Sequence, residues 1–189
     1  TGCLGQRYEK EIFEQLPEVD AIVGTSAYED IVEVIERLID GETCVKHLDS
    51  IDRAMEEKNS QLRIPSTPAY FAYLKIAEGC DNFCTYCVIP KMRGKYRSRH
   101  MESLIEEAKK LAEGGVKELI LIAQDVAYYG QDLYGKNMLA QLLKELCAID
   151  GLEWIRLLYC YPEHLTDDAI AVIASEPKIC HYIDMPIQH

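Results

Sequence analysis

The sequence predicts an α/β protein: a partial (β/α) barrel of about four strands, preceded by the tail of a doubly wound α/β domain. From residue 70 onwards, apolar strand-length runs alternate with amphipathic helix-length segments, a pattern that specifies a parallel sheet with right-handed crossovers. Two prolines flanking Ser and Thr, at residues 65–68, interrupt regular structure before this repeat. Hydrophobic residues make up 48% of the 189 residues, enough to bury a core.

These observations divide the chain into three parts. Residues 1–44 are the carboxyl-terminal part of a first α/β domain, and residues 45–68 are a polar linker. Residues 69–189 are the amino-terminal part of the barrel.

The first part begins with a Gly-rich turn around Cys3 and a short helix over 8–16. The run Ala21-Ile22-Val23-Gly24 predicts a short buried strand. Ser26 and Glu29 form a capping-box pattern that predicts the start of a helix, which Gly41 ends. The apolar face of this helix comprises residues 28, 31, 32, 35, 38 and 39.

The third part contains four predicted strands and three predicted helices. The strands are expected at 70–77, 118–123, 154–159 and about 181–185. The helices have apolar positions between 104 and 112, apolar positions between 138 and 146, and a start capped by Thr166. In (β/α) barrels the chemistry lies on loops at the carboxyl ends of the strands, so these loops are where functional residues are expected.

Charge and composition exclude several classes of protein. No apolar run approaches the ~20 residues that a membrane-spanning helix needs, and no signal peptide is visible, so no membrane partner is expected. The net charge is −12 with a single basic island, which makes nucleic acid an unlikely partner. The chain begins at Thr1 without Met and ends in mid-pattern at His189, so we expect a fragment.

Three of the eight cysteines lie close together, at Cys80, Cys84 and Cys87, just past the first barrel strand. The other five are scattered singly, which argues against a disulfide scaffold and for metal ligands in a reducing, cytoplasmic compartment. Three thiolates in one short loop can bind three corners of a [4Fe–4S] cluster. The fourth iron is then open to a chelating molecule such as S-adenosylmethionine (SAM).

The alternative is a zinc-stabilised α/β binding module without catalytic activity. Structural zinc requires four ligands, usually paired C-x-x-C units, and the spacing here is C-x3-C-x2-C with no second pair in the barrel. His100 is an available fourth ligand, but the segment between is basic. The pattern favours the iron–sulfur cluster.

The chain resembles the radical SAM methylthiotransferases over nearly its whole length. The resemblance rests on the cysteine triplet, on its flanks at 77–80 and 89–99, on Thr1-Gly2-Cys3-Leu4, and on the closing Pro-Ile-Gln-His at 186–189. It implies a radical SAM barrel, an amino-terminal domain with a second [4Fe–4S] cluster, and a small carboxyl-terminal TRAM domain. Cys3 matches the third cysteine ligand of that second cluster; its alternative role is an ordinary loop thiol, and the surrounding Thr-Gly-Cys-Leu-Gly favours the ligand.

Within this family the resemblance is closest to the enzymes that methylthiolate the β-carbon of an aspartate in a small-subunit ribosomal protein. This resemblance rests on residues 123–135, which begin with Ala-Gln-Asp and end with Tyr-Gly-x-Asp-Leu-Tyr-Gly. It implies two uses of SAM and an electron donor such as flavodoxin or ferredoxin. An acidic enzyme also suits a basic ribosomal protein better than a polyanion. The alternative within the family is a tRNA adenosine methylthiotransferase.

Further candidates for SAM binding lie in the expected loops. Tyr86 resembles the aromatic residue near the adenine in this superfamily; its alternative role is a core aromatic. The remaining candidates are polar or charged residues near the predicted strand ends or inside an apolar strand: Arg93, Arg97, Gln124, Asp125, Arg156, Gln188 and, more weakly, His189. Lys91 and Lys95 are expected to be solvated. Gln124 and Asp125 have helix-cap or turn roles as alternatives, and Arg156 requires either a protein partner or a ligand.

Overall fold

The computed structural model describes residues 1–53 and 68–186. These residues form two compact units. The first contains residues 1–53 together with 79–95, and the second contains residues 68–78 together with 96–186. The segment that carries the cysteine triplet therefore belongs to the same unit as Cys3.

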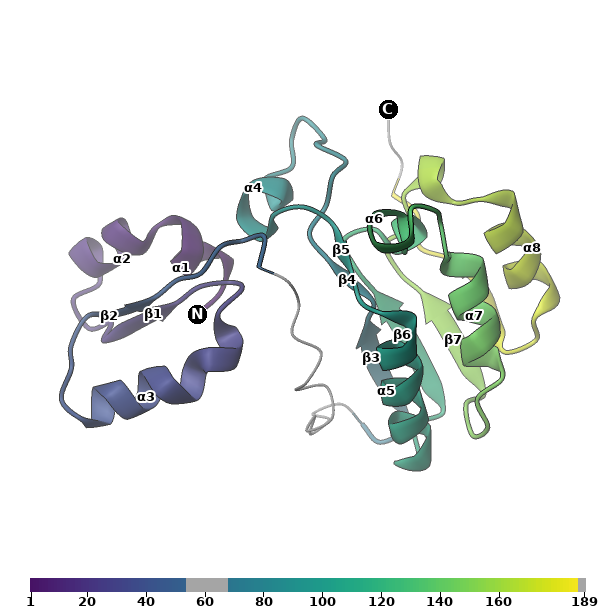
Figure 1. The fold of residues 1–189 in the computed structure, drawn as a ribbon, viewed down its shortest axis with the longest axis horizontal. Helices are drawn as coiled ribbons and strands as arrows, with labels where there is room; N and C mark the ends of the chain where they lie inside the picture. Colours follow the sequence, from purple (N-terminus) through teal and green to yellow (C-terminus); the bar gives the residue numbers. More distant parts are fainter. Residues whose placement is uncertain (54–67, 187–189) are drawn as a thin grey trace. The chain divides into compact units, whose positions relative to one another are not determined.

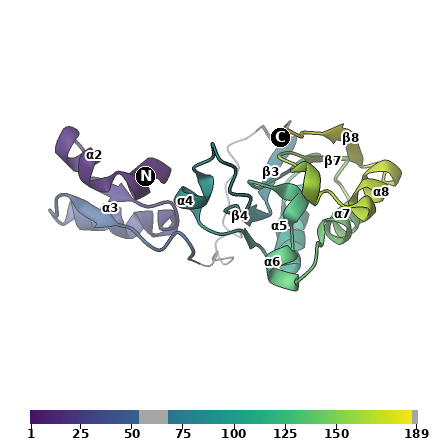
Figure 2. The ribbon, with the colours of Figure 1, turned by 90° about the horizontal axis from the view of Figure 1, so that it is seen from above.

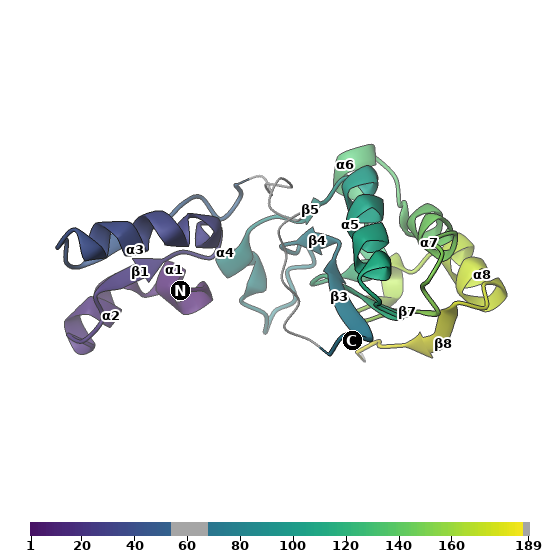
Figure 3. The ribbon, with the colours of Figure 1, turned by 90° about the horizontal axis from the view of Figure 1, so that it is seen from below.

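The first unit is built on a two-stranded parallel sheet with helices on both sides. Strand β1 (Ala21–Val23) pairs with β2 (Val45–His47) in parallel. Helices α1 (Cys3–Arg7) and α3 (Ile31–Ile39) both contact these strands and lie on opposite sides of them (Figures 1 and 3). Parallel pairing with covering helices is the arrangement expected of a doubly wound domain.

The remaining elements of this unit are short. Helix α2 (Glu9–Gln15) follows α1, and a 3₁₀ turn (Tyr28–Asp30) precedes α3. Strand β2 falls at the start of the segment predicted to be a linker. Residues 54–67 of that segment lie outside the described residues, so the domain boundaries at 44 and 68 stay predictions.

The start of α3 differs from the prediction. The capping box does not form: the Ser26 hydroxyl donates to the carbonyl of Asp49 at 3.4 Å, and the helix opens with the 3₁₀ turn instead. Part of the predicted apolar face is also exposed, with Val32 63% and Ile39 78% accessible, while Val34 is buried. A two-stranded sheet covers only one narrow stripe of this helix, so periodicity alone overestimated how much of it is buried.

The second unit contains a four-stranded parallel sheet, as predicted, and its strand order is β3-β6-β7-β8. The strands are β3 (Phe71–Lys75), β6 (Glu118–Ile122), β7 (Trp154–Leu157) and β8 (Ile179–Ile183). The first predicted strand, 70–77, is divided at Ile76. After it, β4 (Ala77–Glu78) leaves the sheet and pairs in antiparallel with β5 (Arg97–Ser98). The last strand begins two residues earlier than predicted.

Helices cover one face of this sheet. Helices α5 (Met101–Glu113), α7 (Leu139–Cys147) and α8 (Asp167–Ser175) lie on the same side of the strands (Figures 1 and 2). The predicted cap of α8 is confirmed, since the Thr166 hydroxyl accepts the N–H of Ala169 at 3.3 Å. No helix within residues 1–53 and 68–186 combines the length and the apolar character needed to cross a bilayer.

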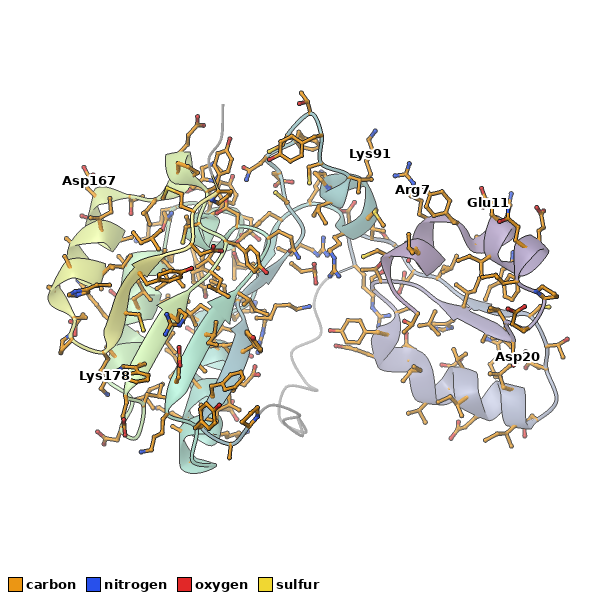
Figure 4. The ribbon with its side chains drawn as sticks, turned by 180° about the vertical axis from the view of Figure 1, so that it is seen from behind. Arg7, Glu11, Asp20, Lys91, Asp167 and Lys178 are labelled. Carbon is orange, nitrogen blue, oxygen red and sulfur yellow. The ribbon has the colours of Figure 1, made fainter. Side chains whose placement is uncertain are left out.

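The two faces of the sheet differ in burial. On the helix-covered face, residues such as Leu74, Leu121 and Leu157 are inaccessible and form the core with α5, α7 and α8. The opposite face, which is turned toward the viewer in Figure 4, leaves Tyr73 39% and Trp154 56% exposed. In Figure 4, Asp167 lies near the carboxyl ends of the strands and Lys178 near their amino ends.

Candidate cofactor site

The cysteine loop, Gly79–Lys95, follows β4 and is closed at its base by two glycines. Gly79 has a φ of +80°, and a Cβ there would clash with the backbone of Lys95 and Gly94. Gly94 has a φ of +74° and packs against the backbone of Ile51. The N–H of Cys80 donates to the carbonyl of Gly94 at 3.2 Å. The two ends of the loop are therefore fixed beside each other, and side chains larger than glycine do not fit at either position.

The three cysteines occupy different environments within this loop. Cys80 is 8% exposed, whereas Cys84 and Cys87 are partly exposed. The N–H of Cys87 donates to the carbonyl of Cys84 at 2.9 Å, so these two residues share one turn. Among the described residues, no three His, Cys, Asp or Glu side chains come together at metal-binding distances. The structure thus places the triplet on one short loop without bringing its sulfur atoms together.

The aromatic residues of the loop are turned to solvent. Tyr86 is 78% exposed and Phe83 70% exposed, and Phe83 has a positive φ of 47°. The alternative reading of Tyr86 as a core aromatic is therefore not supported.

Helix α4 (Ile89–Arg93) ends the cysteine loop and lies against α1. Arg7 of α1 and Lys91 of α4 extend away from these neighbouring helices (Figure 4). Cys3 is the first residue of α1, and the N–H of Gly2 donates to the carbonyl of Val23 at the end of β1. The helix that begins with Cys3 and the helix that follows Cys87 are thus in contact within one unit.

The basic residues at 91–99 differ in how deeply they are buried. Lys91 and Lys95 are exposed, as expected, and Arg93 and Arg97 are partly buried. Arg99 is buried and forms an ion pair with Glu107 at 2.7 Å, and it also donates to the carbonyl of Lys75 at 3.0 Å. Arg99 therefore fixes α5 to the end of β3.

The carboxyl edge of the sheet, defined here as residues 123–128 and 158–164 after β6 and β7, is organised by Asp125. This residue is 1% exposed. Its Oδ1 accepts the N–H groups of Ala127 at 3.1 Å and Tyr161 at 3.2 Å. Its Oδ2 lies 2.6 Å from Nδ1 of His164. Both carboxylate oxygens are thus bonded to protein groups, which supports the turn role rather than SAM binding.

Gln124 is the neighbour of Asp125 and has a different environment. Its Oε1 atom is buried, and no group in the described residues donates a hydrogen bond to it. A buried amide oxygen without a donor is costly, and such groups are usually satisfied by a ligand or by water. Gln124 is therefore the residue of this edge that best fits a ligand with hydrogen-bond donors.

The segment 129–135, which carries the Tyr-Gly-x-Asp-Leu-Tyr-Gly signature, makes internal contacts. The carboxylate of Asp132 in α6 (Gln131–Tyr134) accepts the hydroxyl of Ser98 at 2.5 Å and the N–H of Ser98 at 2.9 Å. The Tyr129 hydroxyl donates to the carbonyl of Arg99, and the Tyr134 hydroxyl accepts the N–H of Met101. The signature therefore holds β5 and the start of α5 in place.

Arg156 finds its partner within the sheet. Its Nε donates to Glu118 of β6 at 2.6 Å, and its guanidinium lies 5.5 Å from the ring centre of Tyr182. The hydrogen bond to Glu118 raises the pKa of Arg156 above its ordinary value. Since Glu118 is the first residue of β6, this pair reaches toward the amino ends of the strands, away from the carboxyl edge. The observation favours the protein-partner alternative.

Two predicted residues fall outside the described part of the chain, and one residue was missed. Gln188 and His189 lie outside the described residues. His164 lies in the 3₁₀ turn Pro162–His164 and was not predicted, because a lone histidine between a strand and a helix carries no sequence signal.

Comparison with known proteins places this fold and loop in a family. The profile of the radical SAM superfamily matches residues 74–189, and the chain belongs to that superfamily. The chain is 58% identical over its 189 residues to ribosomal protein uS12 methylthiotransferase RimO of Lachnoclostridium phytofermentans, and 55% identical to RimO of Clostridioides difficile. These matches confirm the resemblance to the methylthiotransferases. The chain spans 42% of the length of each of these two relatives.

Solved structures agree on the fold. Two structures of the radical SAM methyltransferase TsrM from Kitasatospora setae match at TM-scores of 0.57 and 0.50, with 15% and 19% sequence identity. They cover 88% and 63% of this chain, which in turn covers 37% and 22% of them. At this identity the likeness supports the fold alone.

Proposed function

We propose that this chain is the cluster-binding and SAM-binding part of a methylthiotransferase that modifies an aspartate β-carbon of ribosomal protein uS12. The observation that carries the proposal is the 58% identity to a RimO protein over the whole chain, with the three-cysteine loop intact. In this proposal the enzyme works in the cytoplasm, where thiols stay reduced, and receives electrons from a flavodoxin or ferredoxin.

Cys80, Cys84 and Cys87 are the proposed ligands of a [4Fe–4S] cluster. The donor set fits, since three thiols that form no disulfide share one loop whose ends are held together by Gly79 and Gly94. Thiolates repel one another, so binding to iron is what gathers them. Three ligands leave one iron open for the amino and carboxylate groups of SAM. When bound, the cluster supplies the electron that cleaves SAM to the 5′-deoxyadenosyl radical.

Four further residues are proposed to contact SAM. Tyr86 offers an exposed ring for the adenine. Arg93 and Arg97, both partly buried, offer positive charge for the carboxylate. Gln124 offers its buried amide oxygen to a donor group of SAM. Asp125 and Arg156 are not retained as SAM ligands, because their side chains are bonded to protein groups. Gln188 stays a prediction.

Cys3 is proposed as one ligand of a second [4Fe–4S] cluster that carries the sulfur to be transferred. Its support is the contact between α1 and α4, which brings the helix of Cys3 beside the cysteine loop. The other ligands of that cluster are not identified in this chain.

The cluster assignment is tested by anaerobic reconstitution of the chain with iron and sulfide. We expect close to four iron and four sulfide per chain, and formation of 5′-deoxyadenosine from SAM under a strong reductant. Cys84→Ala should abolish both, since a methyl group cannot replace a thiolate ligand. Cys147→Ala is the control, because this thiol lies in α7 and its pKa is raised to about 11 by burial. Bound zinc without sulfide would contradict the assignment.

The substrate assignment is tested with the whole protein. Purified enzyme with SAM and reductant should increase the mass of the target aspartate of uS12 by about 46 Da, because SCH₃ replaces H. It should leave tRNA adenosine unchanged. Modification of tRNA instead would assign the protein to the other branch of the family.

A further inference from the structure

The pair formed by Asp125 and His164 has the geometry of a ligand-binding dyad. Nδ1 of His164 lies 2.6 Å from Oδ2 of Asp125, shorter than an ordinary N–H···O hydrogen bond and typical of a charged pair. The Asp125 side chain is 2% exposed, and its Oδ1 accepts the backbone N–H groups of Ala127 and Tyr161. A buried carboxylate of this kind is best compensated by a positively charged partner.

The rings of two tyrosines lie close to the imidazole. The centre of the Tyr128 ring lies 4.6 Å from that of His164, and the centre of the Tyr161 ring lies 5.2 Å from it. A carboxylate that holds one ring nitrogen fixes both the orientation and the proton of a histidine, the same logic that operates in Asp–His catalytic pairs.

The other nitrogen of His164 is available. The side chain remains 26% exposed, and because Nδ1 faces the buried carboxylate, Nε2 lies on the accessible side of the ring. No group among the described residues is bonded to Nε2. The dyad lies at the carboxyl edge of the sheet, the same edge as Gln124, where ligands of α/β barrels bind.

We propose that His164 binds a carboxylate group of a ligand through Nε2–H, with Asp125 as the residue that positions it. The inference rests on the proposed function, which brings two carboxylates to this edge: that of SAM and that of the substrate aspartate. An N–H donor does not distinguish between these two carboxylates, so the test has one arm for each.

The decisive variant is His164→Asn. The asparagine amide nitrogen replaces Nδ1 and keeps the bond to Asp125, but the variant has no counterpart of Nε2. His164→Gln is the complementary variant, since its longer amide replaces Nε2 instead. His181→Asn is the matched control, because His181 lies on β8 and is exposed. Thermal unfolding of each variant establishes that the fold is kept.

The first arm measures binding of SAM and of decarboxylated SAM to the reconstituted chain by anaerobic equilibrium dialysis. The second measures binding of a uS12 peptide that contains the target aspartate and of its asparagine counterpart. We expect His164→Asn to reduce the preference for the carboxylate form roughly tenfold in one arm, as loss of a charged hydrogen bond predicts. His181→Asn should change neither preference, and His164→Gln should recover part of it.

The arm that changes identifies the source of the carboxylate. If the parent binds SAM and His164→Asn leaves both preferences unchanged, the proposed role of His164 is wrong and the proposed function stands. If the reconstituted parent does not bind SAM, the proposed function fails and this inference fails with it.

Discussion

The cysteine loop and the loop that follows β6 are both motif-rich, but they are held in different ways. The cysteine loop is closed at its ends by Gly79 and Gly94, and between them it exposes Phe83 and Tyr86. The loop after β6 is buried or partly buried over residues 123–130 and exposed at Asp132, and Asp125 and Asp132 bond it to distant parts of the second unit. A motif can therefore mark either reactive groups or residues that hold the scaffold together.

The largest expected difference is in the rate at which buried and exposed thiols of this chain are alkylated. Burial raises the pKa of Cys160 to about 12, and this thiol is fully buried. At pH 8 its alkylation by iodoacetamide should be roughly a thousandfold slower than that of an ordinary thiol of pKa about 8.5. Site-resolved mass spectrometry measures these rates, with exposed Cys44 as the reference. We expect Cys84 and Cys87 to react at rates close to that of Cys44.

Addition of iron and sulfide sharpens this experiment. Reconstitution should protect Cys80, Cys84 and Cys87 together and leave Cys44 reactive. Protection of only one of the three would contradict their shared role as cluster ligands. Fast labelling of Cys160 would contradict its burial.

Removal of the Asp125 carboxylate should have the next largest effect. Asp125→Ala leaves the N–H groups of Ala127 and Tyr161 and the ring of His164 without their acceptor. We expect the free energy of unfolding to fall by about 3 kcal/mol, measured by urea denaturation. Asp150→Ala, at an exposed turn after α7, is the control and should change it by less than about 0.5 kcal/mol.

Iron binding by the same variant tests whether the cysteine loop depends on the loop that contains Asp125. Because the cysteine loop belongs to the other compact unit, Asp125→Ala should still bind iron and sulfide. Loss of the cluster together with stability would show that the two loops depend on each other.

Substitution of two glycines in the segment 129–135 by alanine should have a smaller effect on stability. Gly130 and Gly135 both have positive φ, at 89° and 69°. A Cβ at Gly130 would lie 2.6 Å from Cβ of Met138, whereas at Gly135 it would meet nothing within 4 Å. Gly135→Ala should cost about 1 kcal/mol for the backbone alone, and Gly130→Ala about 2–4 kcal/mol in total. Equal losses of stability in thermal unfolding would show that the Met138 contact is relieved without cost.

The smallest effect is expected in the first unit. Hydrogen bonds from His47 and then Arg53 hold the pKa of Asp30 below its ordinary value. A lowered carboxyl pKa in the folded state stabilises the fold above the ordinary pKa, and this contribution is lost as the pH falls below about 4. Asp30→Asn should therefore cost less than about 1 kcal/mol at pH 7, and the difference from the parent should shrink at acid pH. A difference that grows as the pH falls would contradict the assignment.

The sequence alone determined the features that depend on neighbouring residues. The spacing of Cys80, Cys84 and Cys87 is local, so the chemistry of the loop could be predicted from it. The alternation of apolar strands and amphipathic helices likewise predicted the four parallel strands, because burial of one face imposes its period on the residues. The same local pattern predicted the Thr166 cap, but it failed for Ser26, whose hydroxyl bonds to a carbonyl 23 residues away.

Only the tertiary structure decided the roles of the charged residues. Asp125 meets His164 across 39 positions, Arg156 meets Glu118 across 38, and Ser98 meets Asp132 across 34. Charged side chains in a core need partners, but no local period specifies which strand or loop supplies them. The partner is set by strand order and register, which bring distant residues to one edge of the sheet. For this reason the sequence predicted where a cluster is held, and the fold indicated which of the surrounding residues are bonded to protein groups.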